Sequence, residues 1–431
     1  MKPETLAGIT TDLSDFSSAY GEDAAVREAL LQVARSRLTL TVDMIPEELR
    51  AGDVLQLGAE PYLLTLCLRR VCTGRLTLVN YFGVDELRGR QVLVNRRTGE
   101  RLQLEYDHFN VESDDFPYPD ASFDVVMACE IIEHLAMNPV RTLAEIHRVL
   151  RPNGAVVITT PNCLSLSRLD GFLEGRGEMV DHYVPAFGYG ARHNREYRPH
   201  ELRELLEATG FVIDEMAVRD LVAGSRRQRV RHAVWKRVLA WHSDHPREEH
   251  IFVRARPGPR FRWNFPTSLF EHIGLYVLVR HSWLEMGIND TIQCAFGWHP
   301  LDRDPVDHRD RRWIDGAGQV LLKAPERISR VGLECFASDA PGAGPLPVRV
   351  VVRHRRQWYR DPAAIYADTV VQVARGAWRT LIVDIPRRPP AGEEIEVNIA
   401  PDVDALSAPA LAVLPARERA LAVHRAWFVS E

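Results

Sequence analysis

The sequence has few cysteines, no long apolar run and no excess of one charge. Its six cysteines form no CxxC pair, which argues against a disulfide or zinc framework and favours free thiols in a reducing cytoplasm. No stretch reaches the ~18 apolar residues of a membrane span, and MKPETLAGIT lacks a signal-peptide core. Net charge is −5, and we interpret the arginine-rich segments 226–231, 309–312 and 353–356 as solvated faces. We therefore expect a cytoplasmic protein without nucleic acid or a membrane span.

The length of 431 residues exceeds one ordinary core and indicates several domains. Residues 1–50 are expected to be helical, and they either cover a ligand or only pack on the next domain. An α/β pattern occupies residues 51–256, a linker with a helical piece (267–280) residues 257–286, and an all-β pattern residues 287–431. We predict an α/β domain followed by an all-β sandwich domain.

The clearest α/β pattern lies in residues 119–162. FDVVMA (123–128) is typical of a strand buried on both faces, and Glu130 follows it. Residues 139–150 place apolar side chains at helical spacing, RPNG (151–154) ends the helix, and AVVITT (155–160) is a second buried strand. Open α/β sheets bind ligands at the carboxyl ends of their strands, so Glu130 is a candidate site residue.

This stretch, with EIIEHL, HRVLRPNG and VVITTPN, resembles the central half of class I S-adenosylmethionine (SAM)-dependent methyltransferases. The resemblance continues more loosely over residues 50–255. It implies a Rossmann-like, seven-stranded sheet with SAM as the cofactor, bound across the carboxyl ends of the first strands. A polar hairpin-like insertion is expected at residues 88–101.

The resemblance also implies a cofactor loop after the first strand, DVLQLG (53–58). The family usually has VLDLGcGtG, whereas this chain has VLQLGAEPY. Gly58 is kept, and Gly58, Ala59 and Glu60 are the predicted SAM contacts. The usual acid and later glycines are replaced by Gln56, Glu60 and Tyr62, a change that resembles a methyltransferase subgroup with VLELGanPY.

Three further residues are predicted to bind SAM by the same resemblance. Asn80 takes the place of the acid that accepts hydrogen bonds from the ribose hydroxyls. Glu112 follows the third strand (104–109) and is expected to meet the adenine amino group, or else is merely solvated within an acidic run. Glu130 completes this set.

The acceptor side is predicted from EIIEH (130–134) and HNREY (193–197). His134, His193 and Glu130 are the candidate catalytic groups, because a neutral imidazole can take a proton from an acceptor hydroxyl near neutral pH. The substrate contacts are expected to be Arg195, Glu196 and Tyr197.

No metal is assigned at EIIEH. This segment resembles an E..EH group that ubiquinone-pathway O-methyltransferases link to a divalent ion, which would make Glu130, Glu133 and His134 the ligands. In the alternative reading, which we prefer, Glu133 and His134 only cap or orient the next helix.

The C-terminal region alternates short β-rich runs with turns, as sandwiches do. The runs are 291–298, 319–322, 330–336, 347–353, 369–373, 378–385, 394–399 and 426–429. GWHPL and RRW resemble β-sandwich modules appended to bacterial glycan-assembly enzymes, which implies a carbohydrate-binding-like domain. The tryptophans that could stack on sugars, or alternatively fill the core, are Trp298, Trp313, Trp358, Trp378 and Trp427.

Three functions remain open at this level. The first is a SAM-dependent methyltransferase that O-methylates a sugar or glycan intermediate. The second is a catalytically inactive methyltransferase-like protein that recruits glycan or partner enzymes. The third is a small-molecule or lipid methyltransferase whose sandwich forms a homodimer.

Overall fold

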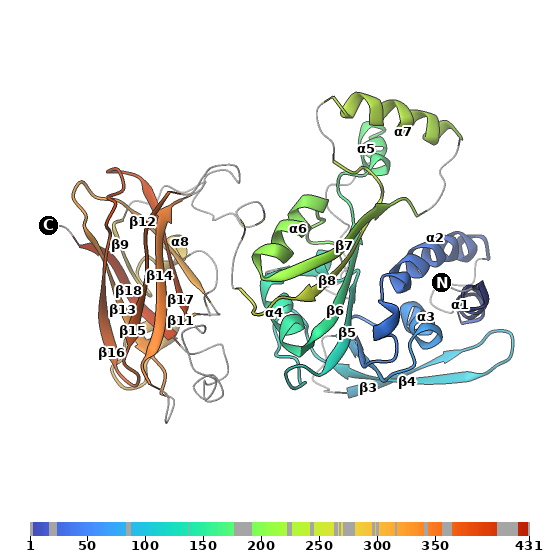
Figure 1. Cartoon of the computed structure of the whole chain (residues 1–431), viewed down its shortest axis with the longest axis horizontal. Helices are drawn as coiled ribbons and strands as arrows, with labels where there is room; N and C mark the ends of the chain where they lie inside the picture. The colour runs from blue at the N-terminus through green and yellow to red at the C-terminus, as the bar shows by residue number, and fades with distance from the viewer. Residues whose placement is uncertain are drawn as a thin grey trace. The chain divides into compact units, whose positions relative to one another are not determined.

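The chain, described by a computed structural model, forms two compact units, 1–262 and 263–431 (Figure 1). The described residues are 3–16, 24–82, 88–136, 138–175, 192–221, 226–241, 245–262, 266, 269, 281–294, 298, 301–314, 317–339, 344–355, 364–402 and 421–429. The helix expected at 267–280 lies outside them, apart from residue 269. No helix within these ranges is long and apolar enough to cross a bilayer.

The first unit contains an eight-stranded sheet in the order β3-β4-β2-β1-β5-β6-β8-β7. Its strands are β1 (Val54–Gln56), β2 (Leu76–Asn80), β3 (Arg88–Val94), β4 (Arg101–His108), β5 (Phe123–Cys129), β6 (Leu150–Pro161), β7 (Phe211–Arg219) and β8 (His250–Pro257). Strands β4, β2, β1, β5 and β6 run parallel, and β8 is antiparallel to both β6 and β7. This is the predicted Rossmann-like sheet with one added strand, because the insertion at 88–101 pairs β3 with β4 at the edge.

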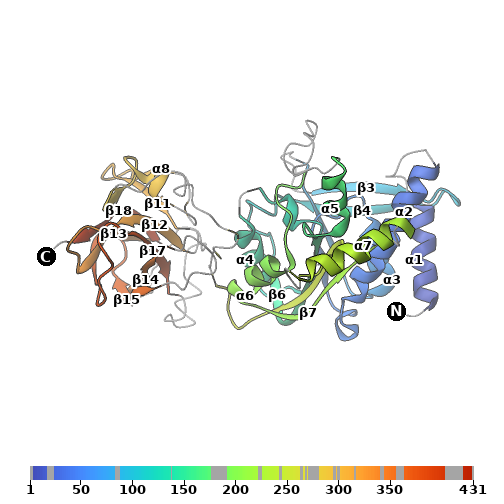
Figure 2. The ribbon, with the colours of Figure 1, turned by 90° about the horizontal axis from the view of Figure 1, so that it is seen from above.

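Helices cover both faces of this sheet (Figures 1 and 2). The described helices of this unit are α1 (Pro3–Asp15), α2 (Ala24–Asp43), α3 (Leu63–Val71), α4 (Pro139–Val149), α5 (Leu166–Leu173), α6 (Pro199–Ala208) and α7 (Arg226–Leu239), with 3₁₀ turns η2 (Glu47–Leu49) and η3 (Ile132–His134); α5 and α7 lie beyond the strand ends. Helix α4 follows the predicted pattern, since Val140, Leu143, Ile146 and Val149 are buried. Its N-terminus is capped by Asn138, whose side chain accepts from the Val140 N–H at 2.9 Å.

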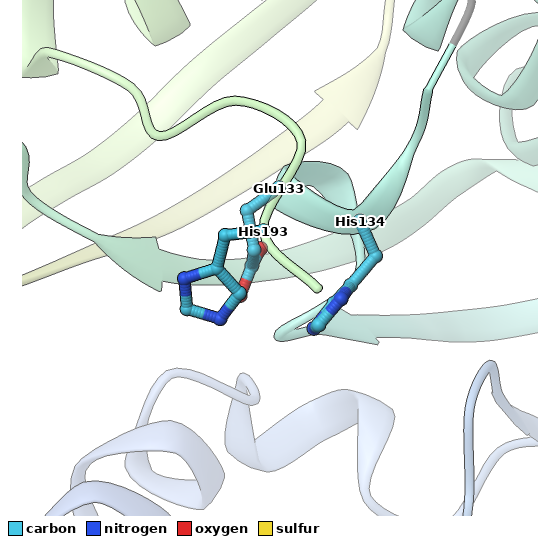
Figure 3. Close-up of side chains that lie close together, drawn as sticks. All are labelled: Glu133, His134 and His193. Carbon is cyan, nitrogen blue, oxygen red and sulfur yellow. The ribbon is translucent and has the colours of Figure 1, made fainter. Parts of the chain in front are cut away.

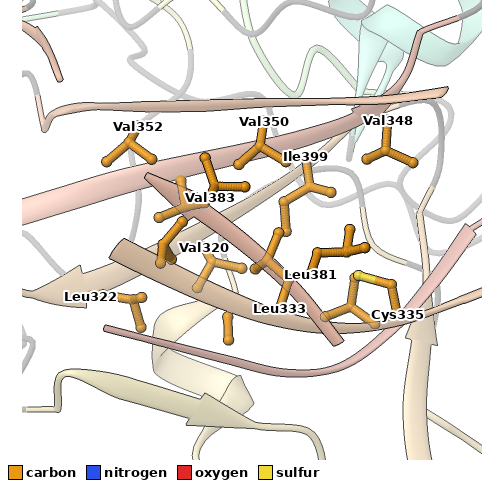
Figure 4. Close-up of a cluster of buried hydrophobic side chains, with 14 of the residues drawn as sticks. Val320, Leu322, Leu333, Cys335, Val348, Val350, Val352, Leu381, Val383 and Ile399 are labelled. Carbon is orange, nitrogen blue, oxygen red and sulfur yellow. The ribbon is translucent and has the colours of Figure 1, made fainter. Parts of the chain in front are cut away.

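The second unit packs two antiparallel sheets face to face. One contains β9 (Trp283–Glu285), β10 (Asp302–Arg303), β11 (Asp310–Trp313), β13 (Arg330–Ala337), β16 (Trp378–Asp384) and β18 (Leu421–Val429). The other contains β12 (Gly318–Lys323), β14 (Leu346–His354), β15 (Ile365–Val373) and β17 (Glu394–Pro401). Alternate side chains such as Val320, Leu333, Val350 and Ile399 fill the space between the sheets (Figure 4).

The strand predicted at 291–298 is wrong at its start. Residues Asp290–Gln293 form the short helix α8 instead. Gln293 is buried there because its side-chain amide donates to the Leu321 carbonyl at 2.9 Å and to the Trp283 carbonyl at 3.0 Å. These two bonds fasten α8 to β12 and β9, a long-range effect that the apolar run did not reveal.

Candidate active site

The loop after β1 turns sharply at Gly58. This exposed glycine has φ of +60°, and an added Cβ would lie 2.4 Å from Ile131 Cδ1. The next residue is held to the sheet, since the Ala59 N–H donates to the Val79 carbonyl at 2.9 Å. Only glycine fits both the conformation and the space, so the exposed backbone remains open to a ligand at the carboxyl edge of the sheet.

Asn80 holds this loop from within the protein. Its side-chain oxygen accepts from the Glu60 N–H at 2.9 Å, and its amide donates to the Tyr62 hydroxyl oxygen at 2.7 Å. Asn80 is only 3% exposed. These two bonds engage the side chain in shaping the loop, and its contact with the ribose stays a prediction. Gln56 has a similar structural role, with its buried oxygen accepting from the Thr65 hydroxyl at 2.8 Å.

Glu112 lies beside the start of α4 and is half-buried. One of its carboxylate oxygens accepts from the Asn138 N–H at 3.1 Å, and its own N–H donates to the Asn110 side chain at 2.9 Å. A carboxylate at a helix N-terminus is electrostatically favourable. Glu112 is therefore not merely solvated, and contact with adenine stays a prediction.

Glu130 follows β5 with a left-handed φ of +55°. Its carboxylate pairs with Arg37 of α2, lies 3.0 Å from His250 Nε2, and accepts from the Thr159 hydroxyl at 2.8 Å. Burial favours the neutral acid, but the His250 hydrogen bond and the Arg37 charge outweigh it and lower the Glu130 pKa to about 2. Such a carboxylate remains ionised near neutral pH. A fixed anion of this kind does not serve as a proton acceptor near neutral pH, and the part of Glu130 in catalysis or cofactor binding stays a prediction.

Glu133, His134 and His193 lie together at the same edge of the sheet (Figure 3). One ligand atom from each lies within 4.8 Å of the others, and the two imidazole centroids are 4.9 Å apart in an edge-to-face arrangement. Glu133 is fully buried. Its Oε2 accepts from the Thr160 hydroxyl at 3.0 Å, whereas Oε1 has no hydrogen-bond partner among the described residues.

Burial, followed by the nearby Glu130 charge, raises the Glu133 pKa to about 8. A buried carboxyl with an unsatisfied oxygen is costly, and such groups concentrate at functional sites. Glu133 can therefore hold a proton at neutral pH beside two imidazoles.

Backbone and carboxylate contacts orient the two imidazoles. His134 Nδ1 lies 3.0 Å from the Arg192 carbonyl, and His193 Nδ1 lies 2.9 Å from Glu196 Oε1. The Asn194 side-chain amide donates to the His134 carbonyl at 2.6 Å, and the Asn194 N–H donates to the Glu133 carbonyl at 2.7 Å. With a proton on each Nδ1, each Nε2 carries a lone pair able to accept a proton or bind a metal.

The three residues predicted to contact the substrate are held by contacts within the protein, and their contact with a substrate stays a prediction. Tyr197 is 2% exposed and bridges to Asn162, and burial raises its pKa. Arg195 pairs with Glu201 at 3.1 Å and lies over the Tyr197 ring. Glu196 pairs with Arg168 and positions His193. We therefore describe these residues as positioning groups.

The cluster offers donors for a metal ion, but not the set Glu130, Glu133 and His134 that the ubiquinone-pathway resemblance implied. Both Glu130 oxygens are engaged, so His193 takes its place beside Glu133 and His134. Two imidazoles and a carboxylate suit Zn²⁺ or a similar transition metal better than Mg²⁺, which prefers oxygen ligands. The unsatisfied Glu133 Oε1 fits such a ligand role.

The strand order defines a Rossmann-like domain, and the cluster lies at the carboxyl edge of its sheet. Residues 32–216 match a family described as a methyltransferase domain. This match, together with relatives named as SAM-dependent methyltransferases, confirms the resemblance of the first unit to the class I SAM-dependent methyltransferases.

Two curated relatives match part of the chain. A "Probable S-adenosylmethionine-dependent methyltransferase" of Mycolicibacterium smegmatis is 36% identical over 31% of this chain and 40% of its own length. The 27-O-demethylrifamycin SV methyltransferase of Amycolatopsis mediterranei is 32% identical over 30% of this chain and 46% of its own length. The chain thus spans less than half the length of these relatives.

Among solved structures, the Burkholderia thailandensis 1,6-didemethyltoxoflavin-N1-methyltransferase, bound to S-adenosylhomocysteine, has a TM-score of 0.33 and 19% identity. That similarity covers 60% of this chain and 91% of the other.

Proposed function

We propose that the chain transfers the methyl group of SAM to a hydroxyl oxygen of a sugar or glycan intermediate. The Glu133–His134–His193 cluster carries this proposal, because it places proton-accepting groups at the sheet edge that the family uses for SAM. Bound SAM supplies an activated methyl group, so the protein mainly positions the acceptor and removes its proton.

His193 is the proposed base. Its Nε2 takes the acceptor proton while Glu196, at Nδ1, stabilises the resulting imidazolium. Gly58, Ala59 and Glu112 border the cofactor side, and Glu130 anchors the edge between them. A metal-assisted variant is also supported by the unsatisfied Glu133 oxygen. In that variant Glu133, His134 and His193 would hold an ion, which would lower the pKa of the acceptor hydroxyl.

A row of side chains on the outer face of the sandwich supports a saccharide acceptor. Strand register aligns Trp283, Trp427, Gly332 and Ile382 across β9, β18, β13 and β16. The Trp427 indole lies against Gly332, where a Cβ would come within 2.4 Å of the ring, and Trp283 is 38% exposed. Exposed indoles are suited to stacking on sugar rings.

The tryptophans predicted for this purpose differ in their placement. Trp313 is buried, and Trp298 packs against the core with its N–H donating to the Gln319 carbonyl at 2.9 Å. Trp378 is half-buried, and Trp358 lies outside the described residues. Trp427 thus remains as a stacking candidate together with Trp283, which sequence patterns did not single out.

The test begins with calorimetric binding of S-adenosylhomocysteine to the full chain. Methyl transfer from labelled SAM is then measured with sugar nucleotides, lipid-linked glycans and a small phenol. Transfer to a saccharide, lost in His193→Ala and kept in His308→Ala, supports the proposal. Transfer only to the phenol overturns the glycan assignment. Absence of cofactor binding at millimolar ligand overturns the activity and favours the recruiting-protein alternative. Loss of activity with a chelator, restored by Zn²⁺, selects the metal-assisted variant.

A further inference from the structure

Helix α7 stands at the same edge of the sheet as the candidate active site. It connects the end of β7 to the start of β8, where His250 pairs with Arg219 on one side and with Pro161, the last residue of β6, on the other. Helix α5 follows β6 at this edge. Figures 1 and 2 show α5 and α7 next to each other beyond the strands. Whatever contacts α7 is therefore brought towards the acceptor side of the first unit.

An apolar stripe on α7 faces outward. Val230, Val234 and Val238 recur every four residues, and Trp241 follows three positions later. Their exposed fractions are 61%, 57%, 42% and 89%, and no residue of α7 is buried. An ordinary surface helix turns such a stripe towards the core. The end of α5 adds two more apolar side chains, Phe172 (60% exposed) and Leu173 (58% exposed).

Positive charge surrounds this stripe. Helix α7 contains six arginine and lysine residues and no acid. Arg231 pairs with Asp170 and Glu174, and Lys236 pairs with Glu248, so two of the cations fasten α7 to its own unit. The remaining four are exposed, and no ion pair with another described residue is found for them: Arg226, Arg227, Arg229 and Arg237.

We propose that α7, with the end of α5, docks on the surface of an anionic lipid bilayer. Cations beside an outward apolar stripe complement both anionic headgroups and the acyl boundary beneath them. A nucleic acid would match the arginines but leave the valines and Trp241 exposed to water. Docking also specifies the acceptor, and this part of the inference rests on the proposed function. The methyl acceptor is then a molecule anchored in a membrane, such as a lipid-linked saccharide.

The test is flotation of the full chain with vesicles of phosphatidylcholine alone or mixed with phosphatidylglycerol. We expect binding to the mixed vesicles only, weakened by salt. Val234→Asp and Trp241→Ser should each reduce binding at least tenfold. Val306→Asp, at an 87% exposed valine of the second unit, is the control and should not. Circular dichroism checks that each variant is folded. Equal binding to both vesicles, no binding to either, or stronger binding to an oligonucleotide than to mixed vesicles overturns docking.

A second readout separates docking from catalysis. Val234→Asp should retain binding of S-adenosylhomocysteine and transfer to a soluble saccharide, yet lose transfer to a vesicle-anchored acceptor. If Val234→Asp keeps full transfer in vesicles, docking does not select the acceptor, and the inference fails. If the wild type binds vesicles but not S-adenosylhomocysteine, docking stands and the proposed function fails.

Discussion

The loop after β1 and the turn after β5 lie at the carboxyl ends of neighbouring strands, yet they use their polar groups differently. At the loop, Tyr62 and the Glu60 N–H bond to Asn80 at the end of β2, and Gln56 at the end of β1 bonds to Thr65. In the turn, Glu133 keeps an unsatisfied oxygen beside two imidazoles. The unusual residues at the loop therefore maintain its shape, whereas the turn offers a carboxylate oxygen and two imidazoles that can hold a proton or a metal ion.

Two carboxylates three residues apart extend this contrast. Glu130 meets a guanidinium, an imidazole and a hydroxyl, which lower its pKa despite burial. The contacts of Glu133, such as the Thr160 hydroxyl, do not compensate for its burial. Burial and the charge of Glu130 therefore raise the Glu133 pKa. Near neutral pH Glu130 is therefore ionised and Glu133 carries a proton, although both are glutamates of the same short segment.

The largest effect should follow removal of the Glu133 acid. Glu133→Gln keeps the size and the Thr160 contact, and we expect methyl transfer to fall by about 10²- to 10⁴-fold because a proton or metal site is lost. Cofactor binding should be unchanged by calorimetry. Glu130→Gln is the matched control and should mainly lower stability, since it weakens the pairs with Arg37 and His250. Full activity in Glu133→Gln would assign the turn a purely structural role.

The same glutamates should give opposite dependences of stability on pH. Between 4.5 and about 8, folded Glu133 keeps a proton that the unfolded chain has lost, so its contribution to stability falls as pH rises. Glu130 contributes above 4.5, and that contribution is lost as pH falls towards about 2. Urea unfolding of wild type and Glu133→Gln should therefore diverge as pH rises. Parallel curves would contradict the raised pKa.

Gly58 should be far less replaceable than another glycine with positive φ. Gly99 has φ of +73° and open space at its Cβ, so Gly99→Ala should cost about 1 kcal/mol. Gly58→Ala also forces the end of the Ile131 side chain to move, which should cost about 0.5–1.5 kcal/mol more, and it should weaken cofactor binding. Chemical denaturation measures both costs. Ile131→Ala should partly rescue Gly58→Ala, and without rescue the clash is not the cause.

Replacing Asn80 should lower the free energy of unfolding, whether or not the residue also contacts the cofactor. Asn80→Ala leaves the Glu60 N–H and the Tyr62 hydroxyl without their partner, at a cost of about 1–3 kcal/mol. Tyr62→Phe should cost less in the Asn80→Ala background than alone. Independent, additive costs in this cycle would show that the Asn80–Tyr62 contact does not hold the loop.

The smallest predicted effect is at Glu196. Glu196→Gln keeps a hydrogen bond to His193 but removes the charge that stabilises its protonated ring. We expect about a tenfold lower rate, or 1.4 kcal/mol, and an acid limb of the pH–rate profile shifted to lower pH. A lower rate with an unchanged profile would mean that Glu196 only supports the local fold.

Sequence patterns predicted the strands and helices of the first unit whose own apolar residues show which face is buried. Strand β5 and helix α4 have their own apolar periodicity, and the structure places them close to the predicted limits, whereas β6 already begins at Leu150 and includes the RPNG segment expected to precede it. The hairpin at 88–101 was also recognised, but its pairing with the sheet, which makes eight strands, was not.

Residues whose partners lie far along the chain were predicted less well. Tyr197 occurs in a polar HNREY run, and its burial depends on the bridge to Asn162. His193 was predicted as a candidate base and stays one, but its grouping with Glu133 depends on how the two segments fold together. The valines of α7 have the spacing of a core-facing stripe, so their exposure became evident only in the structure.

The contacts of Glu130 also affect when the first unit can finish folding during its synthesis. Its partners come from residue 37, residue 159 and residue 250, at the start, middle and end of the first unit. During synthesis the N-terminal part emerges first, but the Glu130 contacts stay incomplete until β8 has left the ribosome. A nascent chain stopped before residue 250 would present an ionised glutamate without its imidazole partner. We expect protease resistance at this edge to be acquired late, after translation passes β8.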